Sequence, residues 1–199
     1  MKASTISKIE NATVKLLSKG GQGILVKNEM ILTAGHCIEF STSGAMALGD
    51  YYLEEIETKQ GLFNVSPLCI EPLSDIAVLG QVDSQELNKD YELFEEFCRI
   101  ITPIKICKDK LEIDKDYEIF ILTHEKKWIT GTAKLYFPDS PVLSIKADEP
   151  IKGGTSGSGI YNKKGEIMGV VSWASEQTYD GCAPRPLLAL PTWICKKVL

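Results

Sequence analysis

Short apolar stretches run through the chain, and most have the length and β-branched content of strands. In the N-terminal part they are separated by glycine or asparagine, which is typical of strands joined by tight turns. Six short strands at this spacing favour a small antiparallel barrel. The predicted strands are residues 12–17, 23–27, 30–34, 45–49, 61–65 and 76–79.

The pattern changes over residues 84–98, where large apolar residues are interspersed with charges in a way closer to a helix than to a strand. We interpret this segment as part of a helical or irregular linker. Strands then resume, and the sequence from Thr192 onward suits a short C-terminal helix. The predicted strands of this second half are residues 117–122, 128–137, 142–146, 159–161, 166–173 and 187–190.

The 199 residues therefore divide into an N-terminal β-barrel lobe (1–83), an inter-lobe linker (84–112) and a C-terminal β-barrel lobe with a helix (113–199). This pattern predicts an all-β fold with a short C-terminal helix. Strand patterns alone leave a single sandwich equally possible. The choice between one sandwich and two barrels depends on the motifs that the strands carry.

Three segments carry candidate chemistry: TAGHC at residues 33–37, SDIAVL at 74–79 and GTSGSG at 154–159. They offer a histidine, an aspartate and a serine, the side chains that nucleophilic acyl transfer needs. Each alone has an ordinary structural explanation, as a packed histidine, the start of a strand or a loop. Together, and in the order His, Asp, Ser, they indicate a catalytic triad of the chymotrypsin type.

By these motifs the chain resembles the trypsin/chymotrypsin-like serine peptidases along almost its whole length. The resemblance implies two six-stranded antiparallel β-barrels, the first carrying His36 and Asp75 and the second carrying Ser156. His36 would act as general base, Asp75 would orient it, and Ser156 would attack the scissile carbonyl. The backbone N–H groups of Gly154 and Ser156 would form the oxyanion hole, in a turn whose dihedrals favour glycine.

The resemblance also implies where substrate binds. Ser172, Trp173 and Ala174 match the segment that pairs with substrate as an added strand, although Trp173 has an alternative explanation as a core aromatic. Pro150 falls at the base of the primary pocket, where trypsin-like enzymes carry an aspartate. We therefore favour a neutral, apolar or small side chain before the cleaved bond, and cleavage after Arg or Lys stays open because Asp180 lies in a nearby loop.

One position departs from the family pattern. Thr155 precedes the serine, where trypsin-like zymogens place an aspartate that pairs with a new N-terminal amine. That salt bridge cannot form here, as in bacterial and viral chymotrypsin-like enzymes. Any regulation would come from an activating partner, from oligomerisation or from loop ordering.

Composition narrows the partners and the compartment. The net charge is −5 and no Lys/Arg-rich run occurs, which argues against nucleic acid or an anionic membrane as partner. No stretch approaches the ~18 apolar residues of a membrane span, and the start of the chain lacks a signal-peptide core, so we expect a cytoplasmic protein. Six cysteines without a secretory signal favour free thiols, with a disulfide or metal binding as alternatives, and we expect no metal or cofactor.

These observations favour a serine endopeptidase acting on proteins. Because a complete triad inside a cell is dangerous if always active, we expect regulation in a pathway such as stress response or antiviral defence. The alternative is a scaffold of the same fold that binds peptides with an idle triad. Esterase or acyl-transfer chemistry on other substrates is a third possibility.

Overall fold

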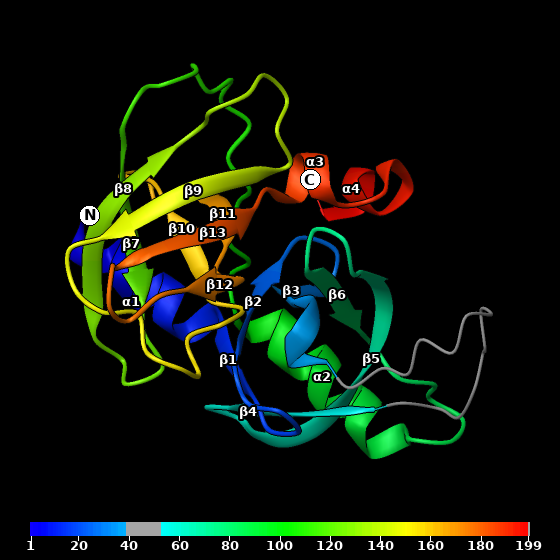
Figure 1. Cartoon of the computed structure of the whole chain (residues 1–199). Coiled ribbons are helices and arrows are strands. Elements are labelled where there is room, and N and C mark those ends of the chain that lie inside the picture. Colours follow the sequence, from blue (N-terminus) through cyan, green and yellow to red (C-terminus); the bar gives the residue numbers. More distant parts are fainter. Residues whose placement is uncertain (39–52, 199) are drawn as a thin grey trace.

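The computed structural model describes residues 1–38 and 53–198 of the chain, which form two β-rich lobes lying side by side (Figure 1). The first lobe is a closed antiparallel barrel with the strand order β1-β2-β3-β6-β5-β4. Its strands are β1 (Thr13–Leu16), β2 (Gln22–Val26), β3 (Met30–Ala34), β4 (Glu54–Thr58), β5 (Gly61–Glu71) and β6 (Ile76–Gly80). The three strands β2, β3 and β6 are buried along their whole length, as their continuous apolar sequences require.

The second lobe is a curled antiparallel sheet of seven strands in the order β11-β10-β7-β8-β9-β13-β12, one strand more than the sequence suggested. Both lobes and their strand-rich character match the predicted two-barrel architecture. The strands are β7 (Tyr117–Leu122), β8 (Trp128–Lys134), β9 (Val142–Ala147), β10 (Gly159–Tyr161), β11 (Ile167–Val170), β12 (Trp173–Ala174) and β13 (Asp180–Pro184).

Several elements differ from the sequence prediction. The strand predicted at residues 187–190 is wrong, because the chain there forms the short helix α3 (Pro186–Ala189). Its proline lies in the first turn, where a missing N–H costs nothing. The sequence analysis also missed α1 (Ala3–Ala12), β4 and β13, and the strand predicted at 45–49 lies outside the described residues.

Helices join and cover the lobes. Helix α2 (Asn88–Ile100) follows the first barrel, where the sequence predicted a helical or irregular linker, and packs on β5. Its Phe94 and Phe97 rings lie 6.1 and 6.0 Å from the ring of Phe63. Helix α4 (Thr192–Val198) forms the expected helix near the C-terminus.

A single apolar core crosses from the first barrel into the second lobe. It includes the barrel interior together with Tyr161, Ile167 and Val170 of β10 and β11 and the buried side of α4. This shared core fixes the lobes against each other, and the segments that carry His36, Asp75 and Ser156 all lie where the lobes meet. Over the described ranges, no helix combines the length and the apolar character that a membrane crossing requires.

Candidate active site

His36 and Asp75 lie at the ends of two paired strands. β3 ends at Ala34 and leads into a 3-10 turn (η1, Gly35–Cys37), whereas Asp75 directly precedes β6. Ala34 pairs with Ile76, so the residues just beyond them are neighbours. The His36 backbone N–H donates to Asp75 Oδ1 at 2.7 Å, and His36 Nδ1 lies 2.7 Å from Asp75 Oδ2.

Asp75 also receives a hydrogen bond from the other lobe. Ser172 Oγ donates to Asp75 Oδ2 at 2.5 Å, although the two residues are far apart in the chain. The carboxylate therefore accepts from a backbone N–H, an imidazole and a hydroxyl. Asp75 adopts φ 56°, an uncommon left-handed conformation for a residue other than glycine, and these hydrogen bonds help to hold it there.

Hydrogen bonding sets the charges of the pair. Burial by itself would raise the pKa of Asp75, but the hydrogen bonds from His36 and Ser172 outweigh it and lower the pKa. The hydrogen bond to Asp75, followed by one to the Cys37 thiol, raises the pKa of His36 from 6.5 to about 10. Asp75 is therefore ionised at neutral pH, and His36 carries a proton on Nδ1 that points at it.

Ser156 lies on a turn built by glycines. The Thr155 N–H donates to the Lys152 carbonyl at 3.2 Å, and Gly154 has φ 86°, which matches the third residue of a type II turn. Gly157, with φ 83°, approaches the first lobe so closely that an added Cβ would lie 1.9 Å from the Gln22 carbonyl oxygen.

The turn leaves two backbone donors available. Neither the Gly154 nor the Ser156 N–H has a hydrogen-bond acceptor among residues 1–38 and 53–198, whereas the neighbouring Thr155 N–H is used within the turn. Two unpaired N–H groups, one on the serine and one two residues before it, are what an oxyanion hole beside this hydroxyl requires. The arrangement is therefore compatible with the role that the sequence predicted for Gly154 and Ser156.

The structure brings Ser156 to the neighbourhood of His36 without joining the two side chains. The Ser156 carbonyl accepts from the Gln22 N–H at 2.8 Å, and an added Cβ at Gly21 would lie 3.0 Å from that carbonyl and 2.6 Å from Cys37 Sγ. The serine loop is thus fixed next to the residue that follows His36. Within the described part of the chain, no hydrogen bond links Ser156 Oγ to His36.

Three solved structures are similar to this chain in fold. The active form of the Rv3671c protease from M. tuberculosis superposes over 98% of this chain and 83% of its own, with a TM-score of 0.63 and 16% identity. The inactive form of the same protease covers 94% of this chain and 89% of its own, with a TM-score of 0.61 and 16% identity. A serine endoprotease from Yersinia pestis covers 98% of this chain and 65% of its own, with a TM-score of 0.63 and 18% identity.

The chain has the chymotrypsin-like serine-protease fold. At these identities the likeness establishes the fold, and the activity depends on the site itself. No protein-family model matches the chain, and no curated protein matches its sequence.

In this chymotrypsin-like fold, the residues predicted to bind substrate lie in different places. Ser172 is buried and bonded to Asp75, whereas Trp173 is 59% exposed and therefore not a core aromatic. Trp173 and Ala174 form β12, the last strand of its sheet, whose second edge is unpaired among the described strands. Pro150 lines a small pocket beside Lys152 to which β12 does not contribute.

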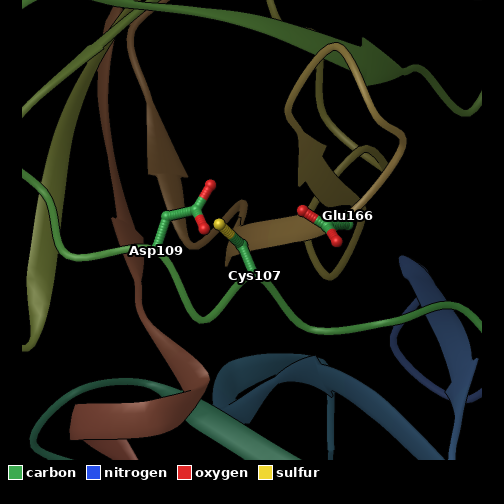
Figure 2. Close-up of side chains that lie close together, drawn as sticks. All are labelled: Cys107, Asp109 and Glu166. Carbon is green, nitrogen blue, oxygen red and sulfur yellow. The ribbon is translucent and has the colours of Figure 1, made fainter.

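One group of side chains in the described ranges could ligate a metal. The sulfur of Cys107 and carboxylate oxygens of Asp109 and Glu166 lie within 4.8 Å of one another (Figure 2). Burial raises the pKa of the Cys107 thiol, which disfavours the thiolate that a metal needs. Lys164 Nζ already lies 3.2 Å from Asp109, and the Asn162 amide donates to Glu166 at 2.9 Å. The hydrogen bonds and the ion pair account for this cluster without a metal.

Proposed function

We propose that this protein is a serine endopeptidase that cleaves protein substrates through an acyl-enzyme intermediate. The observation that carries the proposal is the His36 imidazole held by the Asp75 carboxylate, which Ser172 ties to the second lobe. Next to this pair lies the partly buried Ser156, whose own N–H and that of Gly154 have no acceptor among the described residues. Acyl transfer requires a nucleophile, a general base, a carboxylate that orients the base, and a site that stabilises the oxyanion.

The chemistry follows from these groups. Ser156 Oγ forms a bond to the scissile carbonyl carbon while its proton passes to Nε2 of His36 in its neutral form, whose share grows as the pH rises toward the His36 pKa of about 10. The negative charge on the carbonyl oxygen is stabilised by the N–H groups of Gly154 and Ser156. When the C–N bond breaks, the leaving amine takes the proton from His36. Water then attacks the ester in the same way, which releases the acid and restores Ser156.

The open edge of β12 supports a polypeptide substrate. A peptide can add to an unpaired strand edge through backbone hydrogen bonds, which leaves selectivity to side-chain pockets. The exposed Trp173 ring lies on this edge and offers an apolar contact. Because Pro150 stands at the position where trypsin-like enzymes carry an aspartate, we keep the preference for a neutral, apolar or small side chain before the cleaved bond.

Labelling with a fluorophosphonate probe, followed by mapping of the modified residue, tests the catalytic claim. We expect the label on Ser156 and no label on the Ser156→Ala variant. Ser175→Ala removes another serine of the second lobe and should label like wild type. Cleavage of a peptide library by wild type but not by Ser156→Ala would then separate a peptidase from an esterase.

A second candidate is an idle peptide-binding scaffold, favoured by the missing hydrogen bond between Ser156 Oγ and His36 in the described structure. Catalytic hydrogen bonds are often long before substrate binds, which keeps the peptidase the first candidate. The scaffold would be the better account if wild type and Ser156→Ala bound the same peptides equally well and neither protein cleaved them under any activating condition.

A regulated peptidase fits the same observation. Asp75 and His36 are paired at 2.7 Å, whereas no hydrogen bond joins Ser156 Oγ to the imidazole within the described residues. We infer that an activating partner or loop ordering completes the site, in a cellular pathway such as stress response or antiviral defence. Labelling that rises when a cell lysate is added, and does not rise with the Ser156→Ala variant, is the expected sign.

A further inference from the structure

We propose that His124 is a positioning residue that holds the turn at residues 152–155 in its oxyanion-binding shape. The inference rests on the proposed function, because it concerns the site that would stabilise the reaction's oxyanion. His124 lies in the loop between β7 and β8, far along the chain from Ser156. The sequence analysis gave it no role.

The first contact is between the imidazole and Gly154. A Cβ added at Gly154 would lie 3.3 Å from His124 Cγ and 3.6 Å from its Cβ and Cδ2. The ring therefore packs directly against the glycine whose N–H is one of the two proposed oxyanion donors. The neighbouring Gly153 has no such neighbour, since an added Cβ there would meet no described atom within 4 Å.

The second contact is with Thr155, the residue between the two donors. Its hydroxyl is completely buried, accepts from the His124 backbone N–H at 3.4 Å and lies 3.3 Å from His124 Nδ1. With a neutral ring protonated on Nε2, the hydroxyl donates to Nδ1. His124 thus contacts two consecutive residues of the turn, through its ring face and through hydrogen bonds.

This matters because the turn has an alternative shape. Type I and type II turns differ mainly by a flip of the central peptide, which here joins Gly153 to Gly154. The flip would reverse the direction of the Gly154 N–H and remove one oxyanion donor. Two consecutive glycines impose little steric resistance to it. Packing of His124 on Gly154 at its positive φ favours the type II form.

An ion pair also joins the turn at residues 152–155 to the loop that carries His124, and it provides a control. Lys152 Nζ pairs with Glu125 at 3.0 Å, with both side chains about half exposed. An exposed ion pair of this kind contributes little to holding a backbone in place. Glu125→Gln should therefore leave turnover close to wild type, although it changes the residue next to His124.

The experiment compares His124→Ala, His124→Asn, Thr155→Val and Glu125→Gln with wild type, using peptide turnover and two inhibitors. A peptide aldehyde adds to Ser156 and places its oxygen in the oxyanion site, whereas the matching peptide alcohol binds without that interaction. For His124→Ala we expect kcat to fall roughly 10-fold and aldehyde affinity to fall in parallel, less than the ~10²-fold cost of losing a donor itself. KM and alcohol affinity should change much less than kcat, and thermal stability should fall slightly because the buried Thr155 hydroxyl loses its acceptor.

The conservative variants sharpen the result. His124→Asn, whose amide can reach Thr155, should recover part of the lost kcat. Thr155→Val should lower kcat as well, and the double variant with His124→Ala should lose less than the product of the two single losses, because both changes break one contact. An unchanged kcat in His124→Ala, or equal losses of aldehyde and alcohol affinity, overturns the inference.

A measurement on the protein without substrate separates this inference from the proposed function. The coupling between the amide and α protons of Gly154 in NMR spectra reports its φ, whether or not the protein cleaves peptides. We expect a single positive φ in wild type and Glu125→Gln, and averaging over two values in His124→Ala. Identical couplings in all three would overturn the role of His124, whereas unlabelled Ser156 with the expected couplings would overturn only the peptidase.

Discussion

Replacing Asp75 by asparagine tests the electrostatic reasoning at the site most directly. The carboxylate accepts from the His36 backbone at 2.7 Å, from His36 Nδ1 at 2.7 Å and from Ser172 at 2.5 Å. Asparagine keeps the shape but loses the charge, and its NH₂ can take the place of Oδ2, where two donors already converge. The imidazole then has no acceptor for its Nδ1 proton, so the tautomer that leaves Nε2 free to accept is no longer favoured.

The expected loss of activity is large. Asp→Asn in a triad of this geometry costs about 10⁴-fold in kcat. The pH profile should change as well, because the hydrogen bond to Asp75 is the main cause of the raised His36 pKa. Wild-type activity should rise with pH along a limb that lies above pH 6.5, as His36 loses its proton. In Asp75→Asn the midpoint of this limb should move back toward pH 6.5, and the maximal activity should be much lower.

The stability change has a defined pH window. The His36 pKa is raised from 6.5 to about 10, so its contribution is complete below pH 6.5 and is lost as the pH rises through about 10. The Asp75 pKa is lowered from 3.8, so its contribution is present above pH 3.8 and is lost as the pH falls through the lower folded value. The destabilisation of Asp75→Asn should therefore be largest between pH 3.8 and 6.5.

The size of the destabilisation caused by Asp75→Asn depends on how exposed the His36 imidazole is. Charge-assisted hydrogen bonds contribute about 1.5–3 kcal/mol, and solvent screening of a half-exposed imidazole reduces this to about 1–2 kcal/mol. Urea unfolding across the pH range measures it. Asp139→Asn is the matched control, because exposed Asp139 also has a positive φ, at 54°. A stability difference independent of pH, or an unshifted activity limb, would refute this electrostatic account.

Three further changes have clear expected outcomes. Ser172→Ala removes the hydrogen bond between the lobes and should lower kcat about 10-fold with little change in KM, measured by steady-state kinetics. Phe97→Ala opens a cavity beside Phe63 and should cost about 3–5 kcal/mol in urea unfolding, whereas Ile100→Ala, on an exposed position of the same helix, should cost well under 1 kcal/mol. Gly157→Ala would force a Cβ to 1.9 Å from the Gln22 carbonyl and should abolish labelling of Ser156, and a labelled, stable variant would contradict that close approach.

Local patterns were sufficient to predict most of the barrel strands and the three motif segments. Strands such as β3 and β6 are continuous aliphatic runs, and such runs are buried whichever strands they pair with. In contrast, α1 has no side-chain N-cap and only two buried residues, so its helix depends on tertiary packing. One such contact is the hydrogen bond from Trp128 Nε1 to Glu10 at 2.9 Å, between residues that no local pattern connects.

The same distinction explains the errors and omissions at the site. The strand predicted at 187–190 came from an apolar run, and Pro186 was the available signal for a helix start. Strand β4 has the sequence EEIET. Its first and third residues are buried, but the glutamates hide this alternation from a reading based on apolar residues. The Ser172–Asp75 and His124–Thr155 contacts join segments far apart in the chain, so only the folded structure could bring them together.

The long-range contacts also explain why the candidate site depends on both lobes at once. Asp75 belongs to the first barrel but receives a hydrogen bond from Ser172, and Ser156 belongs to the second lobe but is bonded to Gln22. Each lobe thus positions a group whose partner the other lobe holds. A small change in how the lobes dock would move the serine hydroxyl relative to the imidazole while both barrels kept their own hydrogen bonds.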